Sequence, residues 1–405
     1  MTFKKTLGKI HLWFGLASGI VIVIVSLTGC LYVFEEEIRN FTQHEYRFVA
    51  QSKANKVSLA VLAQTIQKEF PNKQIEQLRL FSDPTRSAIA KLVDTKTIGK
   101  DGLGKKEKEE HEPLKVAYAL NPYTGALISN QDLEHDTMHY VEKIHKSLLL
   151  GEAGKWIIKA NVLIFLAMLL TGLYLWFPSK KNQRKHAFKP KLKGKFQVIN
   201  YSIHNVLGFY FLLPLLLISL TGIWWAVKPV QKITYAALGE TMKEKKKPLS
   251  TYQAGAVFSP QQAFATVATA YPGWQEAHIN FAKNAKECVR VNLKYPYQFY
   301  KKSNEFEFDQ YSGKILYTEL YANYSVADKI KHSNRDLHTG QNFGVLGKFA
   351  AFLASLFAAS LPITGFAIWW GRRKKTIAIP RNRPQQIAVK TQPVFKPKFR
   401  QAEKV

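Results

Sequence analysis

His11-Leu-Trp-Phe-Gly15 and Ser26-Leu-Thr-Gly29, the motifs that decide the fold, return 193 residues later as His204-Asn-Val-Leu-Gly208 and Ser219-Leu-Thr-Gly222. The same shift relates further pairs downstream: His139 and His332, His145 and His338, Thr171-Gly172 and Thr364-Gly365, and Trp176 and Trp369. One ungapped offset that matches so many positions indicates an internal duplication. Each copy is therefore expected to have the same architecture.

Four nearly uncharged blocks predict four membrane-spanning helices: 12–34, 162–177 extended back to 156, 206–227 and 349–370. The first block alone would rise about 35 Å as a helix, which is enough to cross a bilayer core. Each copy contains two spans, so both copies should have the same orientation. We therefore expect two parallel two-helix repeats around a pseudo-twofold axis along the membrane normal. The repeated Thr-Gly pairs are interpreted as helix-packing positions.

The net charge of +29 is concentrated in three segments. Segments 1–10, 178–200 and 371–405 hold three, eight and eleven Lys or Arg residues, with Glu403 as their single acidic residue. Basic segments on one side of all four spans follow the positive-inside rule, which places both termini in the cytoplasm. Membrane topology and contact with anionic lipid account for this charge, so we expect no nucleic-acid partner.

The two cysteines, Cys30 and Cys288, form no disulfide framework, and no C-x-x-C-H motif for covalent haem is present. Leu27-Thr28-Gly29-Cys30 after a basic start resembles a lipoprotein signal. The Ser-Leu-Thr-Gly motif recurs in the third span, however, where Ile223 follows it. We therefore interpret the motif as part of a helix and expect no cleavage.

Two long loops on the non-cytoplasmic side, 35–150 and 228–340, are each expected to fold as a small α+β domain. Period-2 runs around a turn predict strands in 116–128 and 306–317, and helices are expected in 58–70 and 259–271. The Lys/Glu/Gly-rich insertion 99–112 is assigned no role. The chain thus divides as follows: transmembrane helix 1 in 1–34, a first outer domain in 35–150, transmembrane helix 2 in 151–178, a basic connector in 179–200, transmembrane helix 3 in 201–228, a second outer domain in 229–340, transmembrane helix 4 in 341–371 and a basic tail in 372–405.

Histidines that obey the repeat are the candidate functional residues. In a parallel twofold repeat, equivalent inward-facing imidazoles meet across the axis, which is the arrangement that bis-histidine haem b requires. The pairs His11/His204, at the cytoplasmic side, and His145/His338, at the outer side, are therefore predicted to hold haem iron. His139 and His332 lie six residues before the outer pair, on a different helix face, and are further candidates or line the outer site.

Alternative interpretations of these residues exist. Lone histidines at a membrane interface are commonly packing residues, and the four outer histidines could instead bind zinc. The tryptophans are expected to mark the two membrane interfaces: Trp13, Trp156, Trp176, Trp224, Trp225, Trp369 and Trp370. Five histidines without a repeat partner are expected at the surface: His44, His111, His135, His186 and His278. No phosphate-binding, dinucleotide-binding or nucleophile-elbow motif is present.

These motifs resemble the PepSY-associated transmembrane proteins, and Asn121-Pro-Tyr-Thr-Gly125 resembles the end of a PepSY domain. The second outer domain departs from that pattern, with Asp309-Gln310 in place of Asn121-Pro122. The resemblance implies a mostly α-helical protein of the bacterial inner membrane with two b haems on His11, His145, His204 and His338. It implies electron transfer from a cytoplasmic donor or quinol to a periplasmic acceptor, such as a ferric siderophore. The alternative is a non-enzymatic protein whose outer domains bind a peptide or partner.

Overall fold

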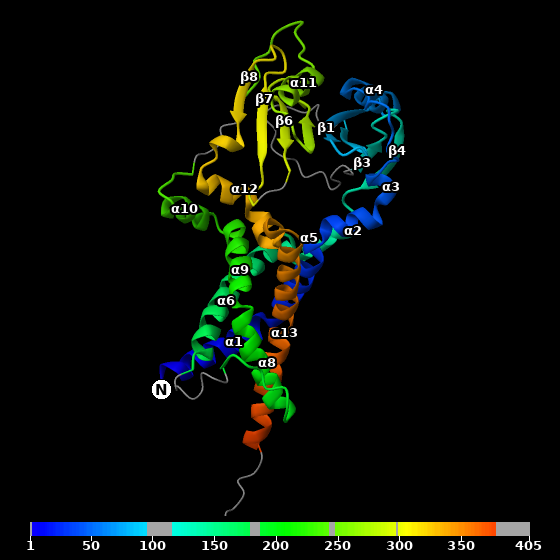
Figure 1. The fold of residues 1–405 in the computed structure, drawn as a ribbon. Coiled ribbons are helices and arrows are strands. Elements are labelled where there is room, and N and C mark those ends of the chain that lie inside the picture. Colours follow the sequence, from blue (N-terminus) through cyan, green and yellow to red (C-terminus); the bar gives the residue numbers. More distant parts are fainter. Residues whose placement is uncertain (1, 95–115, 179–186, 243–247, 297–298, 378–405) are drawn as a thin grey trace, which may run out of the picture.

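The computed structural model describes residues 2–94, 116–178, 187–242, 248–296 and 299–377. The insertion 99–112, His111, His186 and the tail from residue 378 onward lie outside these residues. Figure 1 shows a sheet at one end of the molecule and long helices at the other. The predicted mixture of apolar helices and small α+β regions is therefore present in one chain.

The described elements follow one another in two similar series. In chain order they are α1 (Phe3–Val33), α2 (Glu35–Thr42), α3 (His44–Arg47), α4 (Leu59–Glu69), β1 (Lys73–Phe81), β2 (Ala88–Asp94), β3 (Val116–Leu120), β4 (Leu127–Asp132), α5 (Thr137–Ser147), α6 (Gly151–Trp176), α8 (Phe196–Tyr210), α9 (Leu212–Ala226), α10 (Lys228–Ala237), α11 (Pro260–Ala270), β5 (Glu276–Asn280), β6 (Val289–Lys294), β7 (Ser303–Phe308), β8 (Ile315–Glu319), η2 (Tyr321–Asn323), α12 (Val326–Thr339), η3 (Gln341–Phe343) and α13 (Gly344–Ile377). Each series contains a helix and four strands between long apolar helices.

The apolar blocks form helices of membrane-spanning length. Within the described ranges, α1, α6 and α13 are each long and apolar enough to cross a bilayer, and α8 with α9 qualifies as one span bent by 62°. The sequence predicted this third span but not its break. Pro214 explains the bend, because it has no N–H for the carbonyl of Tyr210 and its ring clashes with the preceding turn. Val21 occupies the matching position of α1, which continues without interruption.

The two outer regions share one antiparallel sheet in the strand order β4-β3-β2-β1-β5-β6-β7-β8. The sequence predicted one strand pair and one helix in each of two separate domains; it did not predict β1, β2, β5 and β6, or that β1 would pair with β5. That pairing centres on Arg79 opposite His278. Helices α4 and α11 pack on the same face of both halves and bury a common core around Leu62, Val267 and Ile279. Their caps at Ser58 and Ser259 match the predicted helix starts.

The opposite face of the sheet is polar where the two halves join, because side chains alternate between faces along a strand. Glu276 forms an ion pair with Arg79 across the join and another with Lys294 at 3.0 Å. His278 Nε2 lies 2.6 Å from a carboxylate oxygen of Glu276 and 2.9 Å from Lys294 Nζ. The His278 side chain is only 19% exposed, so the expectation of a surface histidine was wrong.

This buried cluster predicts an acid-sensitive fold. Burial lowers the pKa of His278 to about 4, although the hydrogen bond to Glu276 opposes the shift. Unfolded chains therefore bind a proton below pH 6.5 that the folded protein does not, so stability should fall as the pH decreases through that window. The expected loss is about 2 kcal/mol between pH 7 and pH 5. It can be measured as the change in Tm of the full-length protein, with His278→Gln as the variant that lacks this titration. Equal acid shifts in both proteins would refute the assignment.

Candidate functional site

Four histidines make the same contact with a threonine hydroxyl at four places among the membrane helices. His11 Nδ1 lies 2.9 Å from Thr171 Oγ1, and His204 Nδ1 lies 2.7 Å from Thr364 Oγ1. Both pairs are separated by 160 residues. At the outer side the contacts are 3.2 Å from His145 to Thr28 and 2.9 Å from His338 to Thr221, both across 117 residues.

The threonine hydroxyls favour one ring nitrogen as the carrier of the proton. Each hydroxyl has one hydrogen, and each donates it to a carbonyl in its own helix, at 2.7–2.9 Å. With its hydrogen donated in this way, the hydroxyl oxygen accepts from the histidine, which favours a hydrogen on Nδ1; His145 Nδ1 also lies 3.0 Å from the carbonyl oxygen of Val25, which can only accept. In a neutral imidazole this leaves the lone pair on Nε2, the nitrogen suited to bind a metal. A partner that orients the ligand ring in this way is typical of metal-binding histidines.

The glycine after each threonine gives the ring room to lie against the helix. A Cβ atom on Gly172 would lie 3.3 Å from His11 Cε1, and one on Gly222 would lie 3.4 Å from His338 Cε1. Gly29 has the same relation to His145, at 3.3 Å, whereas a Cβ on Gly365 would make an ordinary contact with His204 at 3.7 Å. The Thr-Gly pairs therefore contact the histidines, and the interpretation as packing positions missed this role. A threonine that repeats with each of these four histidines was the signal in the sequence.

The outer pair lies at a separation that suits a shared iron. The ring centres of His145 and His338 are 6.2 Å apart, and the ring planes are inclined by 77°. Two nitrogen–metal bonds of about 2 Å, plus the distance from each nitrogen to its ring centre, give a similar value of about 6 Å. Trp225 packs edge-on to His338 at 5.6 Å. The distance between the ring centres therefore matches that of two imidazoles on one iron.

The inner pair lines a cavity of about 350 Å³ between the membrane helices. His11 and His204 both face it, and most of its other lining is apolar, including Phe165, Leu169 and Leu173. Lys4 and Arg372 provide positive charge in the same lining, which suits the carboxylates of a cofactor. Pockets for small molecules and cofactors have volumes of about 300–1,000 Å³ and are lined in this way. The donor set and the lining therefore fit haem.

Two of the predicted interface tryptophans belong to this cavity. Trp176 and Trp369 line it, and Trp176 is buried against Phe209 with ring centres 3.8 Å apart. Trp224 is also buried. Trp13 and Trp156 are exposed. Burial does not fix the depth of a side chain in the membrane, so the interface assignment stays a prediction for all of them.

The remaining histidines lie elsewhere. His332 stacks on Tyr324 with ring centres 4.5 Å apart, and its Nε2 is 3.7 Å from Glu319. His139 lies in the first turn of α5, half-buried. His44 and His135 are exposed, as predicted. Among the described residues, no group of three or more His, Cys, Asp or Glu side chains is arranged to hold a metal ion, which disfavours a zinc site of four histidines.

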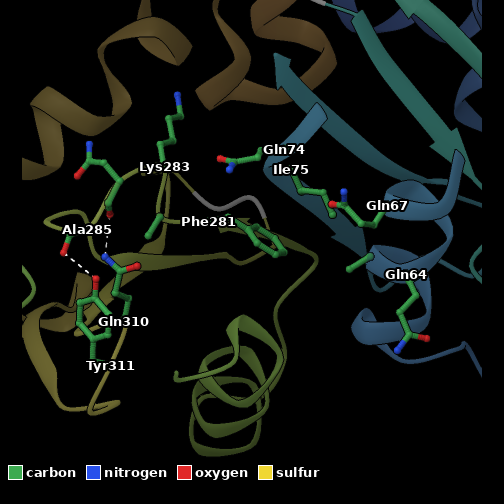
Figure 2. A pocket seen from close by; sticks show the side chains of 12 residues that line it. Gln64, Gln67, Gln74, Ile75, Phe281, Lys283, Ala285, Gln310 and Tyr311 are labelled. Atoms are coloured by element: carbon green, nitrogen blue, oxygen red, sulfur yellow. Dashed lines mark hydrogen bonds between the residues drawn. The ribbon is translucent and has the colours of Figure 1, made fainter. Parts of the chain in front are cut away.

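A second, open pocket of about 570 Å³ lies in the outer sheet region where the two halves meet. Figure 2 shows Gln64, Gln67 and Gln74 on one side and Lys283 and Gln310 on the other. The lining is mainly amide and apolar, and Lys283 forms an ion pair with Glu76. The pocket thus offers hydrogen-bond donors and acceptors with little net charge.

Comparison with known proteins gives a family and little else. The family described as the PepSY-associated TM region matches this chain over residues 9–372. No curated protein matches. Among solved structures, a Clostridium difficile 630 protein named as a lipoprotein is similar over 66% of this chain and 95% of its own, with 8% identity and a TM-score of 0.25. A likeness that weak carries no argument about function.

Proposed function

Because the chain belongs to the PepSY-associated TM family, we propose that it is an electron-transfer protein of the bacterial inner membrane that holds two b haems. The acceptor is a ferric siderophore or another ferric chelate on the outer side, and the donor is a cytoplasmic reductant or quinol. The observation that carries the proposal is the contact of each histidine Nδ1 with a threonine hydroxyl. An Nδ1 hydrogen placed in that contact leaves Nε2 available for iron.

The two haems would lie at two different depths in the membrane, each held by one histidine pair. His11 and His204 would hold the inner haem, and His145 and His338 the outer one. When bound, haem supplies a site that gains and loses single electrons. The helices exclude water from the ligand nitrogens, the threonines orient the rings, and Lys4 and Arg372 offset carboxylate charge at the inner cavity.

The equal spacing of the four contacts also supports the repeat arrangement. Separations of 160 and of 117 residues each occur twice, once in each copy. Two parallel two-helix repeats account for this, with both termini in the cytoplasm according to the positive-inside rule. The outer histidine pair and the sheet then lie on the periplasmic side.

The test is the haem content of purified full-length protein from haem-replete cells. We expect two b haems per chain in a pyridine haemochrome assay, sharp reduced α and β bands, and rapid reoxidation by a ferric chelate. A stable but colourless protein would refute the proposal. Haem that is bound but not reoxidised by any ferric chelate would refute the acceptor while leaving the cofactor intact.

Removing one threonine hydroxyl should weaken haem binding without removing a ligand. Thr221→Val keeps the shape of the side chain but leaves the Nδ1 hydrogen of His338 without its hydroxyl acceptor. Loss of such a ring partner typically costs 10–100-fold in affinity. The measurement is the rate of haem transfer to apomyoglobin, together with the midpoint potential of the outer haem. Ser219→Ala is the matched control, because that hydroxyl donates to Leu215 in its own helix, and it should change neither value.

The pocket of Figure 2 supports a second candidate function, binding of an uncharged polar ligand such as a peptide. Glutamine side chains carry the same donor and acceptor pair as a peptide group. If ligand binding in this pocket is the whole function, the double variant Gln64→Ala/Gln310→Ala should fail to replace the wild-type protein in cells. The single variant His145→Ala should still replace it. The opposite result would favour electron transfer.

A further inference from the structure

Two arginines in the first outer region lie side by side on its membrane side. Arg47 ends α3, and Arg86 lies just before β2. The backbone joins these segments through a bridge between Phe48 and Arg86 and a hydrogen bond from the Ser87 N–H to the Arg47 carbonyl. Figure 1 shows α2 and α3 between this half of the sheet and the membrane helices.

Arg86 is buried with its guanidinium group against two aromatic rings. Its side chain is 9% exposed, and its Cζ lies 5.0 Å from the ring centre of Phe48 and 4.5 Å from that of Phe81. Both distances are within cation–π range. Nη1 donates weakly to Asn40 at 3.4 Å, and Nε is buried without a partner in the described part of the chain.

Arg47 repeats this situation next to it. Its Nε is also buried with no hydrogen-bond partner among the described residues. Burial, followed by the positive charge of Arg86, lowers the pKa of Arg47 to about 10, so the group is still charged at neutral pH. Glu36 partly offsets both charges. Leaving a buried donor unpaired costs about 1–3 kcal/mol, and more for a charged one.

Glu36 offsets part of both charges, and the other two nearby carboxylates are already engaged. Glu276 is engaged with Arg79, His278 and Lys294 at the join of the sheet. Asp83 accepts hydrogen bonds from the backbone and hydroxyl of Thr85. An outside group with several acceptor oxygens would pair the terminal N–H groups of the two guanidinium ions, and carboxylate and phosphate oxygens match that geometry.

We propose that Arg47 and Arg86 form a binding site for an oxyanion, namely a phosphate or carboxylate group. Its place between the sheet and the membrane helices allows two sources, a lipid headgroup or a small soluble acid. The bound anion would tie α3 to the start of β2. The site is independent of haem and of the proposed electron transfer.

The test is calorimetric titration of the full-length protein in neutral detergent with citrate and with inorganic phosphate, at constant ionic strength. We expect saturable binding that weakens at least tenfold in Arg47→Gln. Arg86→Lys keeps the buried charge but loses the planar fork, and it should weaken binding in the same direction. Arg290→Gln is the matched control, because Arg290 on the second half of the sheet already pairs with Glu305 and Glu307.

The outcomes distinguish the two possible sources of the anion from each other and from failure of the proposal. Citrate binding that is lost in nanodiscs of anionic lipid but kept in neutral ones assigns the site to a lipid headgroup. Citrate binding kept in both assigns it to a soluble acid. Wild-type protein that binds neither probe, or equal affinity in wild type and both arginine variants, overturns the proposal.

Discussion

Replacing His338 by alanine is expected to lower the haem content of the purified protein from two haems per chain to one. The outer iron would lose one of its two axial nitrogens, and the remaining imidazole of His145 would face an enlarged, solvent-accessible site. His145→Ala should give the same spectrum, because both substitutions remove the same haem. His11→Ala and His204→Ala should each remove the other one. Pyridine haemochrome assays and reduced-minus-oxidised spectra measure all four variants.

The double variants test the pairing itself. Two ligands of one iron act as a unit, so His145→Ala with His338→Ala should lose no more haem than either change alone. His11→Ala combined with His338→Ala should lose both haems. His332→Ala is the matched control, because its ring stacks on Tyr324, and it should keep two. A chain that loses both haems when His145 and His338 are replaced together, but one with either alone, would contradict this pairing.

Glu37→Ala is expected to cause the largest loss of stability outside the haem sites. Lys348 is 8% exposed, and its Nζ lies 2.7 and 3.0 Å from the two carboxylate oxygens of Glu37. The Glu37 side chain is itself 54% exposed, so water replaces part of the lost contact, and the expected cost is that of an unpaired donor, about 1–3 kcal/mol. Thermal unfolding of the detergent-solubilised protein would measure the loss.

The repeat supplies the control for this substitution. Lys155 is the counterpart of Lys348, and it pairs with Glu152 at 2.5 Å on the exposed surface. Glu152→Ala should leave Tm unchanged, because exposed ion pairs contribute little. Adding Lys348→Met to Glu37→Ala should restore most of the stability by removing the uncompensated charge. A Tm for Glu37→Ala equal to that of Glu152→Ala would show that the buried pair contributes nothing.

Local patterns in the sequence predicted the parts of this protein that depend on neighbouring residues. The apolar blocks identified the membrane helices, and Ser58 and Ser259 identified the starts of two outer helices. The duplication also identified His145 and His338, whose ring centres lie 6.2 Å apart. These features follow from periodicity, capping and repetition, which can all be recognised in the sequence alone.

Features that depend on distant contacts were not predicted. Nothing local in β1 or β5 indicates that the two strands pair, since any exposed strand edge can accept another. The threonines were noticed, but their hydrogen bonds to His11 and His338 require the fold of both helices. The bend of the third span was readable in principle, because Pro214 replaces the Val21 of the first copy.

The join between β1 and β5 bears on how such a chain could have arisen. A polypeptide with one copy would present β1 as an open strand edge, ready to pair with the same edge of a second molecule. Because the pairing is antiparallel, two identical molecules could form it around a twofold axis. A symmetric homodimer is thus the simplest ancestor, and fusion of its two genes would have allowed the halves to diverge.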